Sequence, residues 1–483
     1  MDGTSFRLPN NSLRIVYASG QHSYNVAHVL DHLQAVRCSR SILDGFVPRS
    51  GEIFRAFCPS PWNSSPPSAS PRFAGLPRII PAPKRSCIDT TPRKSKGAAM
   101  KELLGPEQRR ELARRGFSRR DFGRLAALLT AGAALPFYNE ATLAQGLSAF
   151  PNLPPDAVRI NANENPLGPC PEAAEAIHKV VQQGGRYLYG ETFTFVGLLA
   201  ELEGLPKEYV LPFAGSSDPL HRAVLAFTSP GRSFVVADPG YEAGERAAHF
   251  IGARTVKVPL RKDASHDVPA MAQADPDAGL IYVCNPNNPT GSITRKEDIE
   301  YLVANKPKGA VVLLDEAYLH LSYTAEPGTP LVAANKDIII LRTFSKLYGM
   351  AGLRAGAALG RPDLLEKIRG YGAGALPVTG MVGAIASLRV KDLVPKRRQI
   401  IADIREETVE WLDKQGYAVL PSEANMIMVD VRRPGRAFGQ AMLKEKVAIG
   451  RTWPTLPNHV RVSIGTRDEM AKFRAAFTRV MNA

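Results

Sequence analysis

Short apolar runs rich in β-branched residues recur along the chain after Pro151, and a polar stretch with helical periodicity follows most of them. Continuous apolar runs of this length are typical of strands buried on both faces of a mainly parallel sheet. A long helical pattern at 395–415, two shorter strands and a C-terminal helix follow. The pattern predicts an α/β protein with a large, sheet-containing domain and a smaller α+β C-terminal domain. The expected strands are residues 234–237, 255–258, 280–283, 311–314, 338–341, 355–359, 425–431 and 459–464.

The first hundred residues show no sustained period of either a helix or a strand. They include a Pro- and Ser-rich stretch at 59–70 and a basic run at 93–96. Residues 1–99 are therefore expected to be a disordered extension, or not to be translated at all, with synthesis starting at Met100. The remaining expected boundaries are a signal region at 100–150, an N-terminal arm at 151–187, the large domain at 188–375 and the small domain at 376–483.

Residues 114–144 have the order of an export signal. The segment Ser-Arg-Arg-Asp-Phe at 118–122 precedes a moderately apolar stretch at 125–135, and small residues suited to cleavage follow. This segment resembles a twin-arginine signal, and its apolar stretch is too short for a stable membrane span. The resemblance implies export to the periplasm, with membrane contact only during export or through an uncleaved signal. The alternative is an amphipathic helix with a basic start, in a cytoplasmic protein.

The formal net charge of +15 is unevenly distributed. Residues 1–150 contain 21 Lys and Arg against 10 Asp and Glu, whereas the remaining residues contain 40 against 36. The folded part is therefore not expected to present a basic face to nucleic acid. None of the five cysteines has the spacing of a metal ligand set, so we expect neither a zinc site nor a disulfide framework.

The most specific chemical motif is Thr-Phe-Ser-Lys at 343–346, directly after a predicted buried strand. A lysine held in a pocket near other cations has a lowered pKa and becomes a nucleophile. Ser345 and Arg354 follow the same strand, and a guanidinium can pair with a phosphate. The alternative for Lys346 alone is a solvated loop lysine.

Two further motifs also follow predicted strands. Asn288 lies in the turn Asn-Pro-Asn-Asn-Pro-Thr-Gly at 285–291, which fixes a side-chain amide at the edge of the sheet. Asp315 ends the next strand, and Tyr318 comes three residues later. An acid in this place can pair with a protonated ring nitrogen, although Asp-Glu at a strand end is common.

Gly-Ser-Ser-Asp at 215–218 precedes a helical stretch. The N–H groups and hydroxyls of a helix start, here with Ser216 and Ser217, form an anion site, although a simple helix cap is the alternative. Tyr241 follows another strand, where its ring can stack on a planar ligand. Ligands bind at the carboxyl ends of strands in open α/β sheets, so these residues are expected to meet.

Over residues 158–480 these motifs resemble the class I and II aminotransferases of fold type I, and within them the histidinol-phosphate aminotransferase branch. Three further segments support this: Asn-Glu-Asn-Pro-Leu-Gly-Pro at 163–169, Arg-Tyr at 186–187, and Leu-Pro-Asn at 456–458 with Arg-Val-Ser-Ile-Gly at 461–465. The resemblance implies a pyridoxal 5′-phosphate cofactor and a large domain with a mainly parallel, seven-stranded sheet between helices.

The resemblance also implies a role for each site residue. Lys346 carries the cofactor as a Schiff base and moves the proton at the substrate Cα, while Asp315 keeps the ring nitrogen protonated. Arg461 holds the substrate carboxylate and Asn163 lines the substrate pocket. The other cofactor contacts are Asn288 and Tyr318 to the ring oxygen, Tyr241 stacked on the ring, Ser216, Ser217, Ser345 and Arg354 to the phosphate, and Tyr187 from the neighbouring subunit of a homodimer.

The implied reaction is transamination from an amino acid, with a glutamate-like donor expected, to a 2-oxo acid or ketone. A lyase, decarboxylase or oxidase acting on an amino acid is the alternative on the same scaffold. A non-catalytic, cofactor-binding regulator is a second alternative, but residues 1–150 show no helix-turn-helix pattern.

The sequence departs from the branch pattern in two places. Leu188 follows Arg186 and Tyr187 where the branch usually has proline. The stretch from Arg451 to Arg461 is slightly shorter than in the branch and contains Trp453. In that branch this loop faces the distal end of the substrate, so the distal group is left open by the resemblance.

Overall fold

The computed structural model describes residues 106–118, 120–121, 153–154, 156–372 and 376–483. The chain divides into two compact units, residues 1–109 and 110–483, and the following description concerns the second. The extension predicted at 1–99 and most of the signal predicted at 100–150 lie outside the described residues, although a helix, α3 (Pro106–Arg114), is seen. In the described part of the chain, no helix has the length and apolar character needed to cross a membrane. Those residues also contain no cluster of side chains suited to a metal ion.

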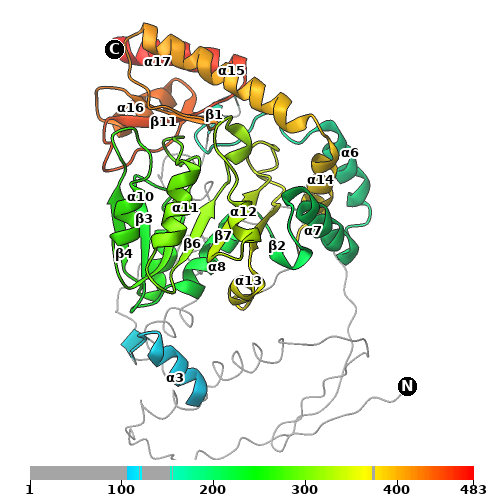
Figure 1. The fold of residues 1–483 in the computed structure, drawn as a ribbon. Helices are drawn as coiled ribbons and strands as arrows, with labels where there is room; N and C mark the ends of the chain where they lie inside the picture. Colours follow the sequence, from blue (N-terminus) through cyan, green and yellow to red (C-terminus); the bar gives the residue numbers. More distant parts are fainter. Residues whose placement is uncertain (1–105, 119, 122–152, 155, 373–375) are drawn as a thin grey trace, which may run out of the picture. The chain divides into compact units, whose positions relative to one another are not determined.

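A seven-stranded sheet forms the centre of residues 110–483 (Figure 1). Its strand order is β2-β8-β7-β6-β5-β3-β4, and β8 is antiparallel to both of its neighbours while the other pairs are parallel. The predicted mainly parallel sheet is confirmed. The strands are β2 (Val210–Phe213), β3 (Ser233–Asp238), β4 (Thr255–Pro259), β5 (Ala278–Cys284), β6 (Val311–Asp315), β7 (Ile338–Thr343) and β8 (Gly356–Gly360).

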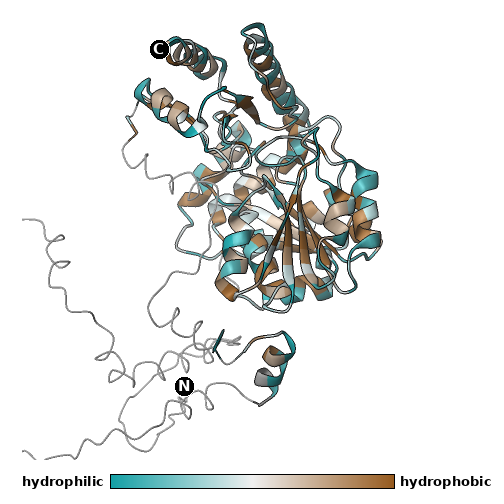
Figure 2. Ribbon diagram, turned by 90° about the vertical axis from the view of Figure 1, so that its left-hand side faces the viewer, coloured by the Kyte–Doolittle hydropathy of each residue, from teal (hydrophilic) through white to brown (hydrophobic). Residues whose placement is uncertain are grey.

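The sequence predicted six of these strands, and burial accounts for all of them except β4, which lies at one edge of the sheet and has a single buried residue. Every residue of β5, β6, β7 and β8 is buried, as continuous apolar runs require. Figure 2 shows these hydrophobic strands between helices whose outer faces are hydrophilic. The missed strand, β2, lies at the edge of the sheet, contains Pro212 and is only partly buried in its middle.

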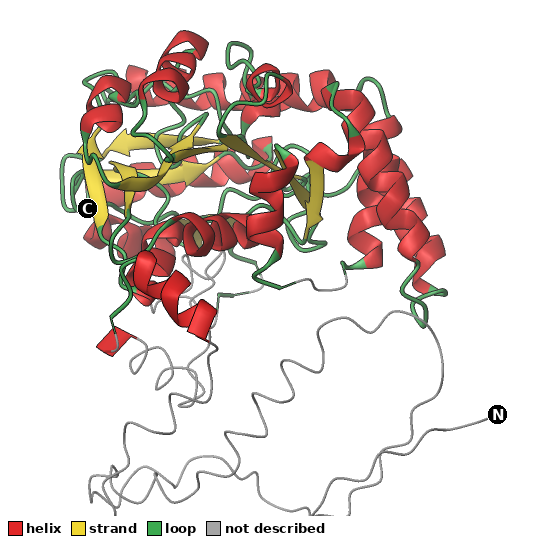
Figure 3. Ribbon diagram, turned by 60° about the horizontal axis from the view of Figure 1, so that its bottom comes forward, coloured by secondary structure: helices red, strands yellow, loops and turns green. Residues whose placement is uncertain are grey.

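Helices cover both faces of the sheet (Figure 3). Helix α8 packs against α9 and α13, and α10 packs against α11. Helix α14 packs against α6 and α7, which precede the sheet in sequence. The bounds are α6 (Pro171–Val181), α7 (Tyr189–Glu203), α8 (Ser217–Phe227), α9 (Ala243–Ile251), α10 (Val268–Gln273), α11 (Lys296–Asn305), α12 (Thr329–Ala333), α13 (Pro362–Arg369) and α14 (Val378–Arg389), with short 3₁₀ turns η2 (Lys207–Tyr209) and η3 (Leu319–Leu321).

The C-terminal part begins with the long helix α15 (Leu393–Lys414) and ends with α17 (Arg467–Asn482). Between them, β9 (Met426–Asp430) pairs with β11 (His459–Ser463) in antiparallel orientation, and α16 (Gly435–Lys444) precedes β10 (Val447–Ile449). The predicted long helix, two strands and final helix are confirmed.

The N-terminal segment of this unit joins the C-terminal part. Strand β1 (Val158–Ile160) pairs in parallel with β10. Neither was predicted, because three residues are too few to show a period. Their pairing places the segment that carries Asn163 beside β11, where the Asn163 N–H donates to the Ser463 hydroxyl over 2.8 Å.

Candidate active site

A cavity of about 280 Å³ lies at the carboxyl ends of the sheet strands. Most of the predicted site residues line it, although they come from turns far apart in sequence. Parallel strands bring their carboxyl ends to one edge, which explains the convergence. The lining residues that were predicted are Ser216, Ser217, Tyr241, Asn288, Asp315, Tyr318, Ser345, Lys346 and Arg354, and those that were not are Ala162, Glu164, Cys284, Ala317, Thr343, Ala351 and Gly352.

Lys346 follows the end of β7 and is only 8% exposed. Its amine donates a hydrogen bond to the carbonyl oxygen of Asn163 over 3.0 Å and lies 5.4 Å from the centre of the Tyr318 ring. Asn163 has a left-handed backbone, with φ of 53°, and its amide donates to the Tyr318 hydroxyl over 3.0 Å. Asn163 therefore connects the lysine to the tyrosine, which the sequence did not indicate.

Asp315 ends β6 and is buried. Burial raises the pKa of its carboxyl group to about 6, although a hydrogen bond from Tyr282 and the Ala317 N–H oppose this effect. The Tyr282 hydroxyl donates to Oδ2 over 2.9 Å, and the Ala317 N–H donates to Oδ1 over 3.1 Å. Tyr282 was not predicted, because it lies within the apolar run of β5 and has the pattern of a core residue.

Arg354 lies in a left-handed conformation, with φ of 59°, and donates to Ser345 Oγ over 3.2 Å and to the Ala214 carbonyl over 2.8 Å. The first turn of α8 has no side-chain cap from Ser216, so its N–H groups favour an anion. A Cβ atom on Gly215, which has φ of 91°, would lie 2.9 Å from the guanidinium carbon of Arg354. Glycine is therefore required for the arginine to lie beside the helix start.

Arg461 lies on β11 and is fully buried. It does not line the cavity, but its Nη1 donates to the Oδ1 atom of the lining residue Asn288 over 2.8 Å, and its Nη2 donates to the Asn161 carbonyl over 2.7 Å. Cys284, which the sequence did not indicate as a site residue, lines the cavity, and burial raises the pKa of its thiol well above the usual range.

Tyr187 lies apart from this cavity. It is 68% exposed, stacks on Tyr189 and borders a separate cavity that is also lined by Phe213 and Arg222. Within one chain, the structure therefore does not bring Tyr187 to the other predicted site residues.

Residues 155–477 match the family described as aminotransferase class I and II. The histidinol-phosphate aminotransferase of Moorella thermoacetica is 32% identical over 333 residues, which are 68% of this chain and 86% of that protein. The aromatic amino acid aminotransferase of Cutibacterium acnes is 31% identical over 338 residues, 68% of this chain and 92% of that protein. The structure of histidinol-phosphate aminotransferase from Sinorhizobium meliloti in complex with pyridoxal-5′-phosphate has a TM-score of 0.64 at 26% identity, and it covers 72% of this chain and 95% of that one.

The chain therefore belongs to the class I and II aminotransferases and has their fold type I architecture. It is a pyridoxal-phosphate-dependent transaminase that acts on small amino-acid and oxo-acid substrates. The cavity residues fit this cofactor. The hydroxyls and Arg354 beside the start of α8 suit a phosphate, and a buried carboxyl group suits a protonated ring nitrogen. The predicted fold, cofactor and enzyme class are confirmed.

Proposed function

We propose that Lys346 is the residue to which this aminotransferase attaches pyridoxal phosphate, and that the same amine removes and returns the proton at the substrate Cα. The observation that carries the proposal is the position of this amine, against the Asn163 carbonyl and the Tyr318 ring, in a cavity that also contains Asp315 and Arg354. When bound, the cofactor supplies an electron sink for the carbanion formed at Cα.

The other cavity residues hold and orient the cofactor in this proposal. Asp315 pairs with the ring nitrogen, and the Tyr282 hydroxyl helps to keep its carboxyl group ionised. Arg354 and the start of α8 bind the phosphate, because both present donors to the same part of the cavity. The remaining assignments are Ser216, Ser217 and Ser345 to the phosphate, Asn288 and Tyr318 to the ring oxygen, and Tyr241 against the ring face.

Arg461 binds the substrate α-carboxylate in this proposal. Its bonds to Asn288 and Asn161 fix the guanidinium at the edge of the cavity, and a fixed, planar fork suits bidentate binding of a carboxylate. Asn163 lies beside the same region and lines the substrate pocket. The names of the two relatives give two candidate substrate classes, histidinol phosphate and aromatic amino acids.

The full chain, purified with its cofactor, tests this function directly. Mixing it with an amino-acid donor in the absence of an acceptor is expected to change the cofactor absorbance and to release the matching 2-oxo acid without consuming oxygen. Borohydride reduction followed by peptide mapping is expected to place the cofactor on Lys346. Oxygen consumption, release of carbon dioxide or a label on another lysine would contradict the proposal.

A homodimer in which Tyr187 reaches the cofactor phosphate of the partner is the second part of the proposal. Large apolar side chains on and beside α6 and α7 are exposed in the single chain: Val181 at 60%, Tyr187 at 68%, Tyr189 at 64% and Phe193 at 77%. An apolar surface of this kind favours association. Sedimentation should give a dimer, and Tyr187→Phe should weaken cofactor binding without changing that dimer.

Export through the twin-arginine route is the third part, and it rests on the sequence of residues 114–144. The protein is then expected in the periplasmic fraction, with a mature N-terminus after the signal. Replacing Arg119 and Arg120 by lysine should leave it in the cytoplasm. Export would be excluded if the protein were found in the cytoplasm with an N-terminus that still includes Arg119.

A further inference from the structure

A second cavity, the junction cavity, has a volume of about 580 Å³ and lies where the end of β7 meets α7, the turn η3 and the start of α15. Among the described residues, only Thr343 lines both this cavity and the active-site cavity. A volume of this size is ordinary for a site that holds a small molecule. The junction cavity is therefore a separate candidate site, and its aromatic and basic lining includes His320, Tyr323, Phe344, Tyr348, Lys391 and Arg398.

Three aromatic rings of this lining pack against one another. The ring centres of Phe344 and Tyr348 are 4.6 Å apart, and those of His320 and Tyr348 are 5.5 Å apart. The side chains of Leu199 and Leu319 add aliphatic surface to the same cavity. Flat and aliphatic surfaces of this kind favour a ligand that contains an apolar ring.

Tyr348 supplies a hydrogen-bond donor to the junction cavity. The residue is only 5% exposed, yet its hydroxyl makes no hydrogen bond with any residue that the structure describes. Burial, together with the nearby Glu203 carboxylate, raises the pKa of Tyr348 well above its ordinary value, so the hydroxyl keeps its proton. Buried polar groups in proteins nearly always have a partner, and a ligand with an acceptor oxygen would provide one here.

Two cations border the junction cavity without a carboxylate partner among the described residues. Arg398 donates from Nε to the His320 carbonyl over 2.9 Å, and its guanidinium carbon lies 5.2 Å from the centre of the Tyr323 ring. Lys391 is exposed and makes no ion pair in that part of the chain. The charge of a third lining cation, Arg342, is by contrast offset by Glu203 and Glu316. The first two cations therefore give the cavity an excess of positive charge.

We infer that the junction cavity is a binding site for a small aromatic carboxylate, separate from the site of transamination. The ring of the ligand lies against Phe344 and Tyr348, and its carboxylate binds to Arg398, whose planar guanidinium suits that group. His320 joins the two donors, because its carbonyl accepts from Arg398 and its ring packs on Tyr348. The two uncompensated cations repel an ammonium group, so a plain carboxylic acid is favoured over an amino acid.

The test is the binding of phenylacetate to the full-length holoenzyme, measured by isothermal titration calorimetry. Phenylacetate has one ring and one carboxylate but no amine, so it cannot react with the cofactor as a substrate does. A Kd below about 1 mM is expected, which is ordinary for a ligand of about ten non-hydrogen atoms. Phenylacetamide has the same shape without the charge and should bind at least about tenfold more weakly. Absence of saturable phenylacetate binding, or equal binding of the amide, overturns the inference.

Variants of the lining place the ligand in the junction cavity. Arg398→Gln should raise the Kd of phenylacetate at least about tenfold, and Tyr348→Phe, which removes only the hydroxyl, at least about threefold. Lys396→Gln is the matched control, because Lys396 is also a cation near the start of α15 but pairs with Asp392 and does not line the cavity. That control should leave the Kd unchanged. An unchanged Kd in folded Arg398→Gln and Tyr348→Phe proteins overturns the inference.

Two further variants keep the test decisive. If Arg398→Gln does not fold, as judged by cofactor absorbance and Tm, Lys391→Gln at an exposed position replaces it and should raise the Kd about threefold. Arg461→Lys distinguishes the two cavities, because the proposed function assigns carboxylate binding in the active site to Arg461, and it should leave the Kd unchanged. Binding that is lost in Arg461→Lys but kept in Arg398→Gln would place phenylacetate in the active-site cavity and overturn the inference, while transamination would stand.

Discussion

Two adjacent carboxyl groups, those of Asp315 and Glu316, are equally buried but have opposite surroundings. Asp315 lines the cavity and accepts hydrogen bonds from two neutral donors, the Tyr282 hydroxyl and the Ala317 N–H. Glu316 is bonded to the guanidinium of Arg342, which also makes two bonds to Glu203 over 2.7 and 2.9 Å. Both lie at the end of β6, and their side chains point to different environments because neighbouring positions alternate.

The difference shows how the end of one strand can carry two buried carboxyl groups, one that is paired within the protein and one that the proposed function assigns to the cofactor. In the Glu316 cluster, the carboxylates of Glu316 and Glu203 share one cation of the protein, the Arg342 guanidinium, so neither depends on a ligand for an opposite charge. At Asp315 burial raises the pKa to about 6, which is the expected result when neutral donors only partly replace water. A buried carboxyl group with a raised pKa beside a cavity is stabilised in its ionised form when a cation binds next to it. A protonated ring nitrogen is such a cation.

The largest expected effect concerns the cavity that Asp315 lines, and within it Lys346. Lys346→Ala should reduce kcat by at least about a thousandfold, because the proposed function assigns to this amine both the proton transfer and the attachment of the cofactor. Steady-state transamination assays measure this loss, and thermal unfolding should show an intact fold. Lys336→Ala, on the exposed loop after α12, is the control and should retain full activity. A Lys346→Ala protein with near wild-type turnover would contradict the claim that the cavity beside Asp315 is the active site.

The structural side is tested by Glu316→Gln. The substitution removes the buried ion pair with Arg342, but the Arg342 guanidinium keeps its two bonds to Glu203. The free energy of unfolding should therefore fall by about 1.5–3 kcal/mol, the usual value of a hydrogen bond to a charged group. Denaturant unfolding measures this loss, while kcat of the remaining folded protein should stay close to that of the wild type. Glu326→Gln removes an exposed carboxylate paired with Lys296 and should change stability very little. If Glu316→Gln instead abolished turnover of a stable protein, the distinction between the two neighbours would fail.

The sequence could predict the cavity side of this comparison far better than the structural side. Lys346, Asp315 and Asn288 belong to motifs that are local in sequence, and the apolar runs before them identify the strands. Glu316 and Arg342 have no such signal, because their pairing joins two strands and depends on the sheet order. For the same reason Tyr282 has the pattern of a core residue, although its hydroxyl contacts Asp315.

The site between the sheet and the C-terminal part was also only partly predictable. Arg461 was identified from its motif, but its bond to Asn288 spans 173 positions and requires β11 to lie beside the sheet. Glu242 and Arg451 are 209 positions apart, and neither residue alone suggests that they meet. Long-range ion pairs follow from the packing of elements, which periodicity does not define.

The pH dependence of stability gives the next test, through Asp315 in the cofactor-free protein. Its folded pKa of about 6 lies above the ordinary aspartate value of 3.8, so the folded state binds more protons between these values. Stability should therefore fall as pH rises from about 3 to about 7, by roughly 3 kcal/mol relative to Asp315→Asn, which has no charge to bury. Denaturant unfolding of both proteins across this range measures the difference. Parallel curves would show that Asp315 is not destabilised by burial.

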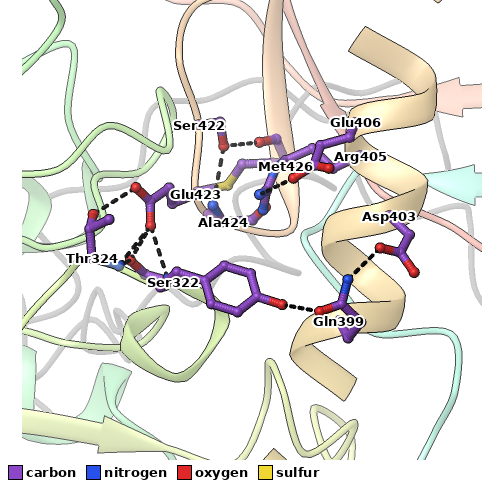
Figure 4. A network of polar contacts seen from close by, with 11 residues as sticks. Ser322, Thr324, Gln399, Asp403, Arg405, Glu406, Ser422, Glu423, Ala424 and Met426 are labelled. Carbon is purple, nitrogen blue, oxygen red and sulfur yellow. Dashed lines mark hydrogen bonds and ion pairs between the residues drawn. The ribbon is translucent and has the colours of Figure 1, made fainter. Parts of the chain in front are cut away.

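The smallest expected effect concerns a third carboxylate, Glu423, which lies between α15 and β9. Its pKa shows whether neutral hydrogen-bond partners or the degree of burial raises the pKa of Asp315. Glu423 also accepts hydrogen bonds from neutral donors: the hydroxyls of Ser322 and Thr324 and the N–H groups of Tyr323 and Thr324 (Figure 4). Burial alone would raise its pKa, but these donors outweigh burial and the pKa lies below its ordinary value. Neutral partners alone therefore do not raise a carboxyl pKa; the number of donors and the degree of burial decide the direction.

Glu423→Gln should then cost about 1 kcal/mol of stability near neutral pH, a value kept small by partial solvent exposure. Because the folded pKa is lowered, this contribution is fully present above the unfolded value of about 4.5 and is lost as pH falls through the folded pKa, which is the opposite direction to Asp315. Denaturant unfolding at pH 7 and below pH 4 measures both values, with Glu406→Gln on the exposed side of α15 as the control. A loss that persisted at low pH would mean that the shape of the side chain, rather than its charge, stabilises the 322–324 loop.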